Sequence, residues 1–393
     1  MNLIPEQFKG EIALRIDKIR AEMHANEVNA LLIGSNANIY YTSGLFFRGY
    51  VFIPEFGEPH WFIIKPQIYD TDSSTSFIRK PEEILTYLRE NGLENLKSIG
   101  LEENDLSYSD IIRLKSIFPD SKLFNGSIIL KNARKTKTEW EINEMKIDGI
   151  HQSKVYGEIK DCYKKGMTDL ELQIEIEKRL RLEGSLGVSR VAGNLMEINL
   201  GSVISGENAD NPSPYEFTMG GAGVNAALPV GANGSTILKG QTVMIDMNGA
   251  FNGYQTDMTR VWSLGQTSDL AIKAHNCSIK ILRLLEKKAV PGFPVKDLYE
   301  IAMSCVDEDG LKEFFMGHRS QVGFIGHGVG IELNELPVLN PRSKDTIQEG
   351  MTIAIEPKFV IPGVGAVGVE NTYVVREHGL ENITVFAEEI QTF

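Results

Sequence analysis

The pattern of apolar and polar positions predicts two parts with different architectures. In the first part, residues 12–26 show the apolar spacing of a helix, and the apolar run 30–34 is typical of a buried strand. Further elements are expected as strands at 50–53, 61–64 and 98–101 and as helices at 81–90 and 108–117. This alternation predicts an α/β domain over residues 1–133. It shows no glycine-rich phosphate loop, so we expect it to serve architecture, dimer contacts and a lid.

The second part, residues 134–393, follows the basic segment 131–137 and opens with two helices whose starts are marked. Thr138 is followed three residues later by Glu141, and Thr168 by Glu171, which is the capping-box pattern. Helices are therefore predicted over 139–163 and 170–182, and apolar spacing predicts two more over about 269–288 and 295–307. The polar, glycine-rich segment 203–240 predicts a loop that lines a site.

Two short strands joined by a tight turn are expected over residues 243–260. Val243–Ile245 and Met258–Trp262 are strand-like, and the residues between them are turn formers. Each strand carries one carboxylate, Asp246 and Asp257, and their odd separation predicts that both lie on one face of the hairpin. Two like charges this close repel each other, so a positive group must offset them.

A second hairpin is expected over residues 351–375, with its turn near Pro362–Val364. Glu356 and Glu370 interrupt apolar strands, and their even separation with an odd-length loop again predicts one shared face. Carboxylates in such places are rarely buried unless they are paired or bind a metal. No lysine or arginine alternates suitably with Glu370, which argues against a salt bridge. One histidine, His327, lies among three glycines, which permit close approach to a crowded site.

Four inward carboxylates and one histidine form an oxygen-rich ligand set with a single nitrogen. Such a set suits two hard or borderline divalent ions, such as Mn, Co, Fe or Zn. Two ions would lower the pKa of a shared water and supply a nucleophile near neutral pH. The alternatives are two aspartates that flank a solvated turn and a histidine packed in a glycine-rich turn.

Composition narrows the classes of function. The 393 residues carry a net charge of −13 and show no basic block, so we expect no nucleic-acid partner. Cys162, Cys277 and Cys305 are odd in number and widely spaced, which is typical of free thiols in a reducing compartment. The sequence shows neither an apolar signal core nor an apolar run long enough to span a membrane. We therefore expect a cytoplasmic protein with no membrane partner.

The order Asp-x10-Asp, Gly-His-Gly-Val-Gly, Glu-Pro and Val-Glu-Asn resembles the creatinase, prolidase and aminopeptidase P family. The resemblance covers nearly the whole chain, including the early segment Asn-Ile-Tyr-Tyr-Thr-Ser-Gly. It implies a creatinase/prolidase-like α/β domain over residues 1–133 and an α+β catalytic domain of the pita-bread fold over residues 134–393. A homodimer is also implied, in which one subunit's N-terminal domain reaches the other's site.

The resemblance also implies a site. It implies two divalent ions, with manganese as the first choice and Co, Zn or Fe as others. The implied ligands are Asp246, Asp257, His327, Glu356 and Glu370, with Asp257 and Glu370 bridging. Glu356 is implied as the acid/base partner of the bridging water, and therefore as the catalytic residue.

The sequence departs from this family around the ligands. Asn334 stands where its peptidases carry a histidine seven residues after His327, and Gly323 stands where relatives often carry another. The family's arginine before the last ligand is Gly368 here, and a loop motif that ends in histidine is expected to end at Ser213 or Val230. Losing donors that contact the substrate carbonyl costs orders of magnitude in rate unless other groups replace them. The candidate substrate contacts are Asn334, Asn208, Asn225, Tyr215 and Val230.

The sequence therefore predicts a dinuclear metal-dependent hydrolase of a peptide or related C–N bond, similar to Xaa-Pro dipeptidases and aminopeptidases. The replaced histidines predict weak turnover of ordinary Xaa-Pro dipeptides. They leave open another enzyme on the same fold, such as a hydrolase or lyase of a small nitrogen compound. A non-catalytic metal-binding protein is a third alternative, against which the intact ligand set argues.

Overall fold

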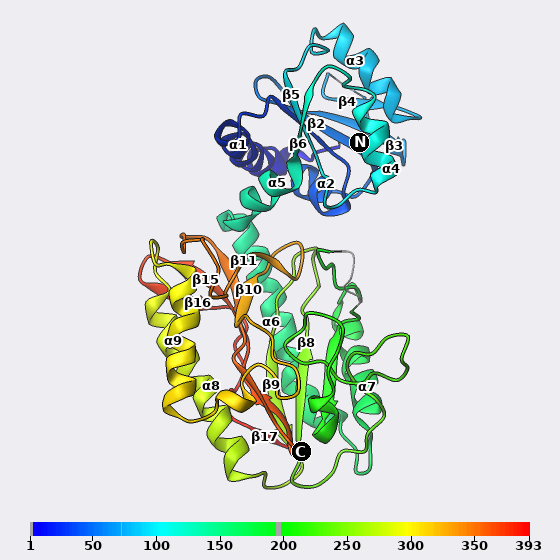
Figure 1. Cartoon of the computed structure of the whole chain (residues 1–393). Helices are drawn as coiled ribbons and strands as arrows, with labels where there is room; N and C mark the ends of the chain where they lie inside the picture. Colours follow the sequence, from blue (N-terminus) through cyan, green and yellow to red (C-terminus); the bar gives the residue numbers. More distant parts are fainter. Residues whose placement is uncertain (1–2, 72, 194–197) are drawn as a thin grey trace. The chain divides into compact units, whose positions relative to one another are not determined.

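A six-stranded sheet forms the centre of the first unit, Met1–Arg134, in the computed structural model, which describes residues 3–71, 73–193 and 198–393 (Figure 1). Its strands follow the order β4-β3-β2-β1-β5-β6, with β1 antiparallel to β2 and parallel to β5. They are β1 Ala30–Ile33, β2 Arg48–Pro54, β3 His60–Lys65, β4 Thr75–Phe77, β5 Ser98–Leu101 and β6 Lys122–Asn125. The helices are α1 Lys9–Ala25, α2 Asn36–Ser43, α3 Ile84–Glu90, α4 Tyr108–Lys115 and α5 Gly126–Lys135. Short 3-10 helices are η1 Glu6–Phe8 and η2 Pro81–Glu83. The expected α/β architecture is thus confirmed.

Two pairs of helices cover the strands of the second unit, Lys135–Phe393. They are α6 Glu139–Cys162, α7 Asp169–Glu183, α8 Asp269–Lys288 and α9 Val295–Glu308. Both expected capping boxes are present: the Thr138 hydroxyl accepts from the Glu141 amide at 3.2 Å, and the Glu141 carboxylate accepts from the Thr138 amide at 2.9 Å. Among the described residues, no helix is both long and apolar enough to cross a membrane.

Three sheets make up the strand layer of the second unit. The first has the order β17-β9-β8-β7, with bounds β7 Gly201–Ser205, β8 Thr242–Met247, β9 Thr259–Ser263 and β17 Gln391–Thr392. The second has the order β11-β10-β12-β15-β16, with bounds β10 Gly326–Gly328, β11 Glu335–Val338, β12 Thr352–Ile355, β15 Asn371–Arg376 and β16 Gly379–Asn382. The third pairs β13 Lys358–Ile361 with β14 Gly365–Gly368. A bridge between Thr259 and Glu370 links the first sheet to the start of β15.

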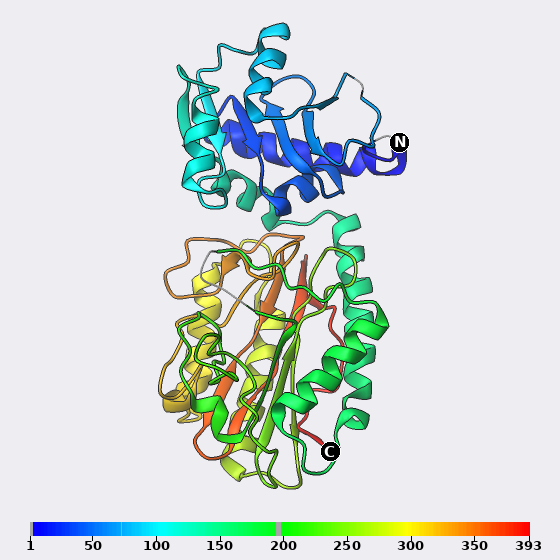
Figure 2. The same cartoon turned by 90° about the vertical axis from the view of Figure 1, so that its right-hand side faces the viewer.

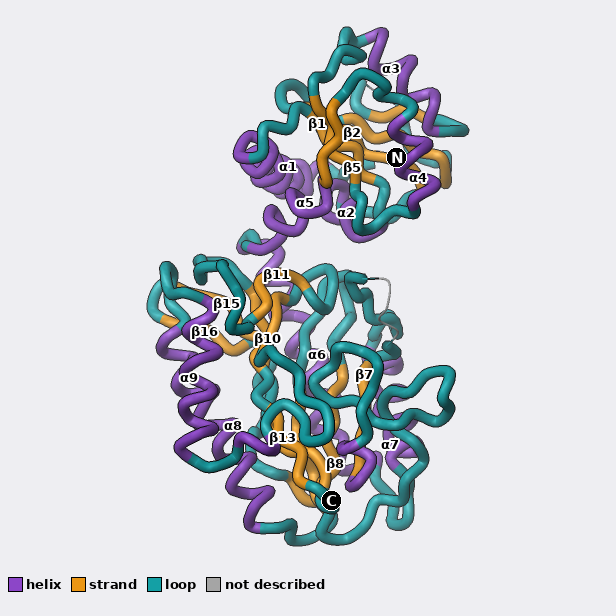
Figure 3. The backbone as a smooth tube through the Cα atoms, in the orientation of Figure 1, coloured by secondary structure: helices purple, strands orange, loops and turns teal. Residues whose placement is uncertain are grey.

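Among the described residues of this unit, two core clusters lie on opposite sides of the strands. The α8 and α9 helices bury residues such as Ile281 and Leu298 against β12 to β14, and α6 and α7 bury residues such as Tyr156 and Ile176 against β7 to β9. Figures 1 and 2 show the strands between the two helix pairs, and Figure 3 shows how much of the segment between β7 and β8 is loop. This segment contains η3 Gly206–Asp210, and η4 Lys312–Phe314 follows α9. The strand layer thus presents side chains from both hairpins between the two helix pairs.

Candidate metal centre

The first hairpin brings Asp246 and Asp257 to one cavity. In the antiparallel pair β8–β9, Asp246 lies opposite Thr259. A bridge between Gly249 and Thr256 continues the same register, which sets Asp257 opposite Asn248, two positions from Asp246. Because side chains alternate along a strand, residues two apart share a face. Asp246, Asn248 and Asp257 all line the cavity, as the expected single face requires.

A buried polar network on α6 holds the turn of this hairpin. The Asp148 carboxyl group is fully buried and accepts a hydrogen bond from the Phe251 amide at 2.6 Å. Its second oxygen lies 3.1 Å from the Thr256 hydroxyl, which is also 2.8 Å from the Gln152 amide oxygen. Burial raises the pKa of Asp148 to about 7, against the lowering effect of its hydrogen bonds. The network fixes the backbone directly before Asp257.

The second hairpin sets Glu356 opposite Glu370. Thr352 pairs with Val374 in β12–β15, and Lys358 pairs with Gly368 in β13–β14. Both pairs follow one register, which places the two glutamates directly across from each other on the expected common face. Both are buried, with Glu356 4% and Glu370 1% exposed.

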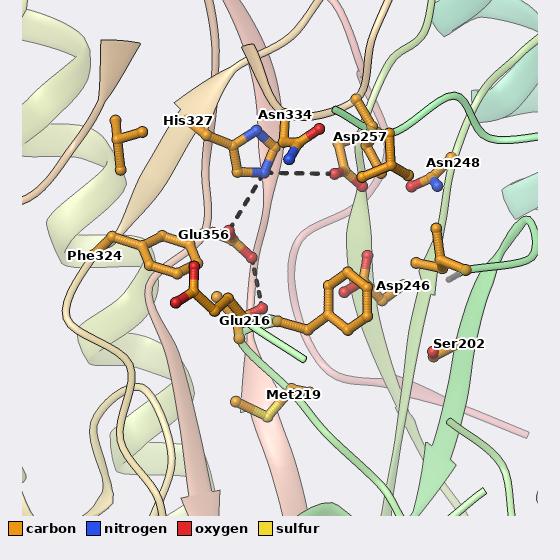
Figure 4. Close-up of a pocket in the computed structure, with 16 residues that line it drawn as sticks. Ser202, Glu216, Met219, Asp246, Asn248, Asp257, Phe324, His327, Asn334 and Glu356 are labelled. Carbon is orange, nitrogen blue, oxygen red and sulfur yellow. Dashed lines mark hydrogen bonds and ion pairs between the residues drawn. The ribbon is translucent and has the colours of Figure 1, made fainter. Parts of the chain in front are cut away.

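His327 reaches these carboxylates from β10. Its Nδ1 lies 3.0 Å from the Gly328 carbonyl oxygen, which can only accept, so we assign the proton to Nδ1. The Nε2 lone pair then faces Glu356 Oε1 at 3.6 Å and Asp257 Oδ2 at 3.9 Å (Figure 4). The neighbouring Gly326 permits this close packing, since a Cβ there would lie 2.2 Å from the Ala354 carbonyl oxygen.

A cavity of about 170 Å³ opens above these groups (Figure 4). The expected site-lining loop contributes four consecutive residues to it, Glu216, Phe217, Thr218 and Met219. Other apolar walls come from Val191, Ile198, Phe324, Leu333 and Val338. The cavity therefore combines an acidic floor with apolar sides.

Lys358 is the residue of this site that the sequence analysis missed. It follows Glu356 by two positions, so strand alternation turns it to the same face. Its side chain is fully buried, and Nζ lies 2.8 Å from one oxygen each of Asp246, Glu356 and Glu370. The expectation that no basic residue alternates with Glu370 was therefore wrong, because it considered the strand of Glu370 and not the strand across from it. A lysine inside the apolar run after Glu356 was the available signal.

The charge of the cluster is only partly offset by this lysine. Burial by itself lowers the pKa of Lys358, but the surrounding carboxylates raise it well above its ordinary value. Burial, followed by the nearby Glu370 and Asp246 carboxylates, raises the pKa of Asp257 well above its usual range. Burial and Glu356 raise the pKa of Glu370 to about 8. A further cation beside Asp257 and Glu370 would stabilise both as carboxylates.

Two buried oxygens indicate where such a cation fits. Asp257 Oδ1 and Glu370 Oε1 have no hydrogen-bond partner among the described residues. Asp257, His327 and Glu370 offer ligand atoms that all lie within 4.8 Å of one another. Buried carboxylates with orphaned oxygens and an imidazole with a free lone pair are suitable ligands for a divalent ion. The donor set thus fits a divalent metal at Asp257, His327 and Glu370.

The structure separates the candidate substrate contacts. Asn334 lines the cavity, and its side-chain amide pairs with the main chain of Ala192, accepting at 2.7 Å and donating at 3.0 Å. Asn208, Asn225, Tyr215 and Val230 are not among the described residues that line this cavity. Asn208 instead donates to Asp169 and to the Gly231 carbonyl, so it ties the loop to α7. The loop lines the cavity with residues 216–219, and a role of the other four residues in substrate binding stays a prediction. The short run Phe217–Met219 could have signalled that lining.

A buried cluster of carboxylates and one imidazole at the base of a cavity is typical of metal-dependent hydrolases. Residues 143–377 match the model of metallopeptidase family M24, and residues 15–136 match the creatinase/prolidase N-terminal domain. The chain therefore belongs to metallopeptidase family M24, with the pita-bread catalytic fold that the resemblance implied. Membership implies a hydrolase and divalent metal ions.

Individual relatives match along nearly their whole length. An Xaa-Pro dipeptidase of Pyrococcus horikoshii is 27% identical over 96% of this chain and 98% of its own. The solved structure of an Xaa-Pro dipeptidase from Bacillus anthracis matches with a TM-score of 0.79 at 21% identity, over 97% of this chain and 100% of its own. An X-Pro aminopeptidase from Thermotoga maritima matches with a TM-score of 0.76 at 23% identity, over 95% and 100%. At these identities the solved structures support the fold.

Proposed function

We propose that this chain is a divalent-metal-dependent hydrolase of the C–N bond in a short peptide, with Xaa-Pro substrates as the first class to test. The observation that carries the proposal is the convergence of Asp257, His327 and Glu370, of which Asp257 and His327 line a small cavity. The relatives named as Xaa-Pro dipeptidase and X-Pro aminopeptidase support this substrate class. The apolar walls suit a hydrophobic ring or side chain beside the scissile bond.

The roles of the chain's own residues follow from their contacts. When bound, a divalent ion polarises a carbonyl oxygen and lowers the pKa of a water. Glu356 is the proposed acid/base: Oε2 accepts from Thr218 at 2.7 Å and from Lys358 at 2.8 Å, while Oε1 faces His327. Those two donors hold the carboxylate in one orientation, so that a proton is taken up and returned at Oε1. Asn334 positions the segment around Ala192 over the cavity and does not exchange protons.

Manganese is the metal that we propose, ahead of cobalt, zinc and iron. One imidazole nitrogen among carboxylate oxygens is a set that hard divalent ions accept. The family resemblance implied two ions held by all five ligands and did not include Lys358. The presence of that ammonium bears on the number of ions and not on the need for a divalent one.

The test is a hydrolysis panel. The purified protein, loaded with Mn, Co or Zn in turn, is assayed against Gly-Pro, Ala-Pro, longer Xaa-Pro peptides and matched Xaa-Ala controls. We expect metal-dependent cleavage before proline, abolished by His327→Ala, and slow on plain dipeptides because no imidazole stands at position 334. Absence of cleavage with every metal and peptide would overturn the Xaa-Pro proposal.

A second candidate is hydrolysis or lyase chemistry on a small non-peptide nitrogen compound. The residues around the metal ligands favour it. Asn334 and Gly323 stand where the family's peptidases carry histidines, and Lys358 contacts the carboxylates. Screening small amides and cyclic nitrogen compounds with the same metal-loaded protein separates the two candidates.

We propose a cytoplasmic homodimer with neither nucleic acid nor membrane as partner. The buried free thiols of Cys162, Cys277 and Cys305 suit a reducing compartment. Phe46 is 45% exposed and stacks on Tyr40, whereas the adjacent Phe47 is buried in its own unit, so we propose Phe46 as a contact residue of the dimer. Light scattering tests the assembly, and a monomer at micromolar concentration would count against it.

A further inference from the structure

We propose that the Lys358 ammonium takes the place of one metal ion in this centre, so that the chain binds one divalent ion and not two. The inference rests on the proposed metal site and concerns how that site is completed. It assigns Lys358 a permanent role as the second cation of the cluster.

The contacts of Lys358 are those of a bound cation. Its Nζ lies 2.8 Å from Asp246 Oδ2, Glu356 Oε2 and Glu370 Oε2 and 3.1 Å from the Thr218 hydroxyl. A metal bound to the same three carboxylate oxygens would have to occupy the space that the ammonium fills. The side chain is fully buried, so leaving these partners would strand a charge in the interior.

The remaining donors lie on the other side of the same carboxylates. Glu370 gives Oε2 to Lys358 and leaves Oε1 without a partner among the described residues. Glu356 gives Oε2 to Lys358 and turns Oε1 toward His327. Both glutamates therefore stand between an ammonium and a second set of donor atoms, just as bridging carboxylates stand between two metals. Asp257, His327 and Glu370 complete that single set.

Repulsion between positive charges favours the same arrangement. The cluster holds four carboxylates and one lysine, and on the side away from the ammonium Asp257 Oδ1 and Glu370 Oε1 have no partner among the described residues. One divalent ion there changes the formal charge of four carboxylates and one ammonium from −3 to −1, and a second ion would change it to +1. A second divalent ion at Asp246 would stand directly beside Nζ, and two positive charges in contact repel strongly in a buried site.

The test counts metal ions without any substrate. The chain is saturated with Mn, and separately with Zn, and the ions per chain are measured by native mass spectrometry and elemental analysis. We expect one ion in the wild type and two in Lys358→Ala, whose shortened side chain opens the second position. The matched control is Lys137→Ala, which removes another buried lysine, paired with Glu335 at 2.9 Å, and should keep one ion. Mn-loaded samples add an electron paramagnetic resonance readout, since only two adjacent ions couple magnetically.

Asp246→Asn keeps the test decisive if Lys358→Ala does not fold. Asp246 contacts the ammonium, so this variant should still bind one ion, whereas His327→Ala should bind none. Two ions in the wild type, or one ion in a folded Lys358→Ala, would overturn the inference and leave the hydrolase proposal intact. One ion in a chain that cleaves none of the peptides would overturn the substrate proposal and leave this inference intact.

Discussion

Replacing Asp148 with asparagine should stabilise the catalytic unit at alkaline pH and leave it unchanged near pH 4. Thr256 has one hydroxyl proton but lies between two acceptors, Asp148 Oδ2 at 3.1 Å and Gln152 Oε1 at 2.8 Å. A protonated Asp148 supplies the missing proton, because its O–H donates to Thr256 and Thr256 then donates to Gln152. An asparagine amide makes the same donation and still accepts from the Phe251 amide. Asp148→Asn therefore keeps the network and removes the ionisation.

The magnitude follows from the pKa difference. The pKa of Asp148 is about 7 in the folded protein and ordinarily 3.8. The folded state binds a proton that the unfolded state has released between these values, so stability falls as pH rises through this window and is flat above it. Each pH unit is worth about 1.4 kcal/mol, so the loss by pH 8 is at most about 4 kcal/mol. Asp148→Asn should recover this loss at pH 8 and about 1.5 kcal/mol of it at pH 5.

The assay is urea unfolding at pH 4, 5, 6, 7 and 8, followed by tryptophan fluorescence. Trp61 lies in the first unit, whereas Trp140 and Trp262 lie in the second, so a Trp61→Phe background reports on the catalytic unit alone. Subtracting the two stability curves isolates position 148 from other titrating groups. Asp148→Ala is the control and should destabilise at every pH, because the Phe251 amide loses its acceptor. A difference between Asp148→Asn and wild type that is constant from pH 4 to 8 would refute the reasoning.

Three further predictions concern the cavity and the turn. Asn334→Ala removes both hydrogen bonds to the main chain of Ala192 and should raise KM about 10-fold at unchanged metal content; a fall in kcat at constant KM in steady-state kinetics would contradict a positioning role. Thr218→Val removes a donor to the Glu356 carboxylate and should lower kcat about 10- to 100-fold, with Thr218→Ser restoring it; equal activity of Val and Ser variants would disprove this. Gly249→Ala places a Cβ 2.2 Å from a hydroxyl oxygen of the turn and should cost the unit about 1–3 kcal/mol in urea unfolding, whereas Gly10→Ala, with open space around it, should cost nothing.

Much of the fold could be predicted because local sequence patterns indicate most of its helices and strands. The two capping boxes are present, and α6 begins at the expected residue while α7 begins one residue earlier than expected. Strand alternation predicted that the two aspartates share one face of the first hairpin and the two glutamates share one face of the second. This prediction needs only the separation of the residues and the length of the loop. The helix α2, Asn36–Ser43, was not predicted, because its polar start and β-branched residues carry no helical periodicity.

The path of the irregular loop could not be read in the same way. Segment 203–240 lines the cavity as expected, but through residues 216–219, which were not singled out, because loop conformation depends on tertiary contacts and not on period. Asn208 is held by Asp169 and Gly231, which are 39 and 23 residues away. Such long-range hydrogen bonds leave no local pattern in the sequence. A polar residue that seems suited to bind substrate, such as Asn208, can therefore hold the loop in place instead.

Lys358 could also have been located from the strand alternation that located the carboxylates. Residues two apart on a strand share a face, so a lysine at 358 faces the carboxylates as surely as Glu356 does. The close carboxylates required a positive group, and a metal ion was expected to provide it. The resemblance concerns the shared ligands and does not cover the other residues of the site. The structure shows that part of the compensating charge is covalently present, 2.8 Å from three of the carboxylate oxygens. In metal-free protein, Asp246, Glu356 and Lys358 should therefore stay in place. The negative charge that lacks a compensating cation should lie at Asp257 and Glu370, which each have one oxygen without a hydrogen-bond partner among the described residues.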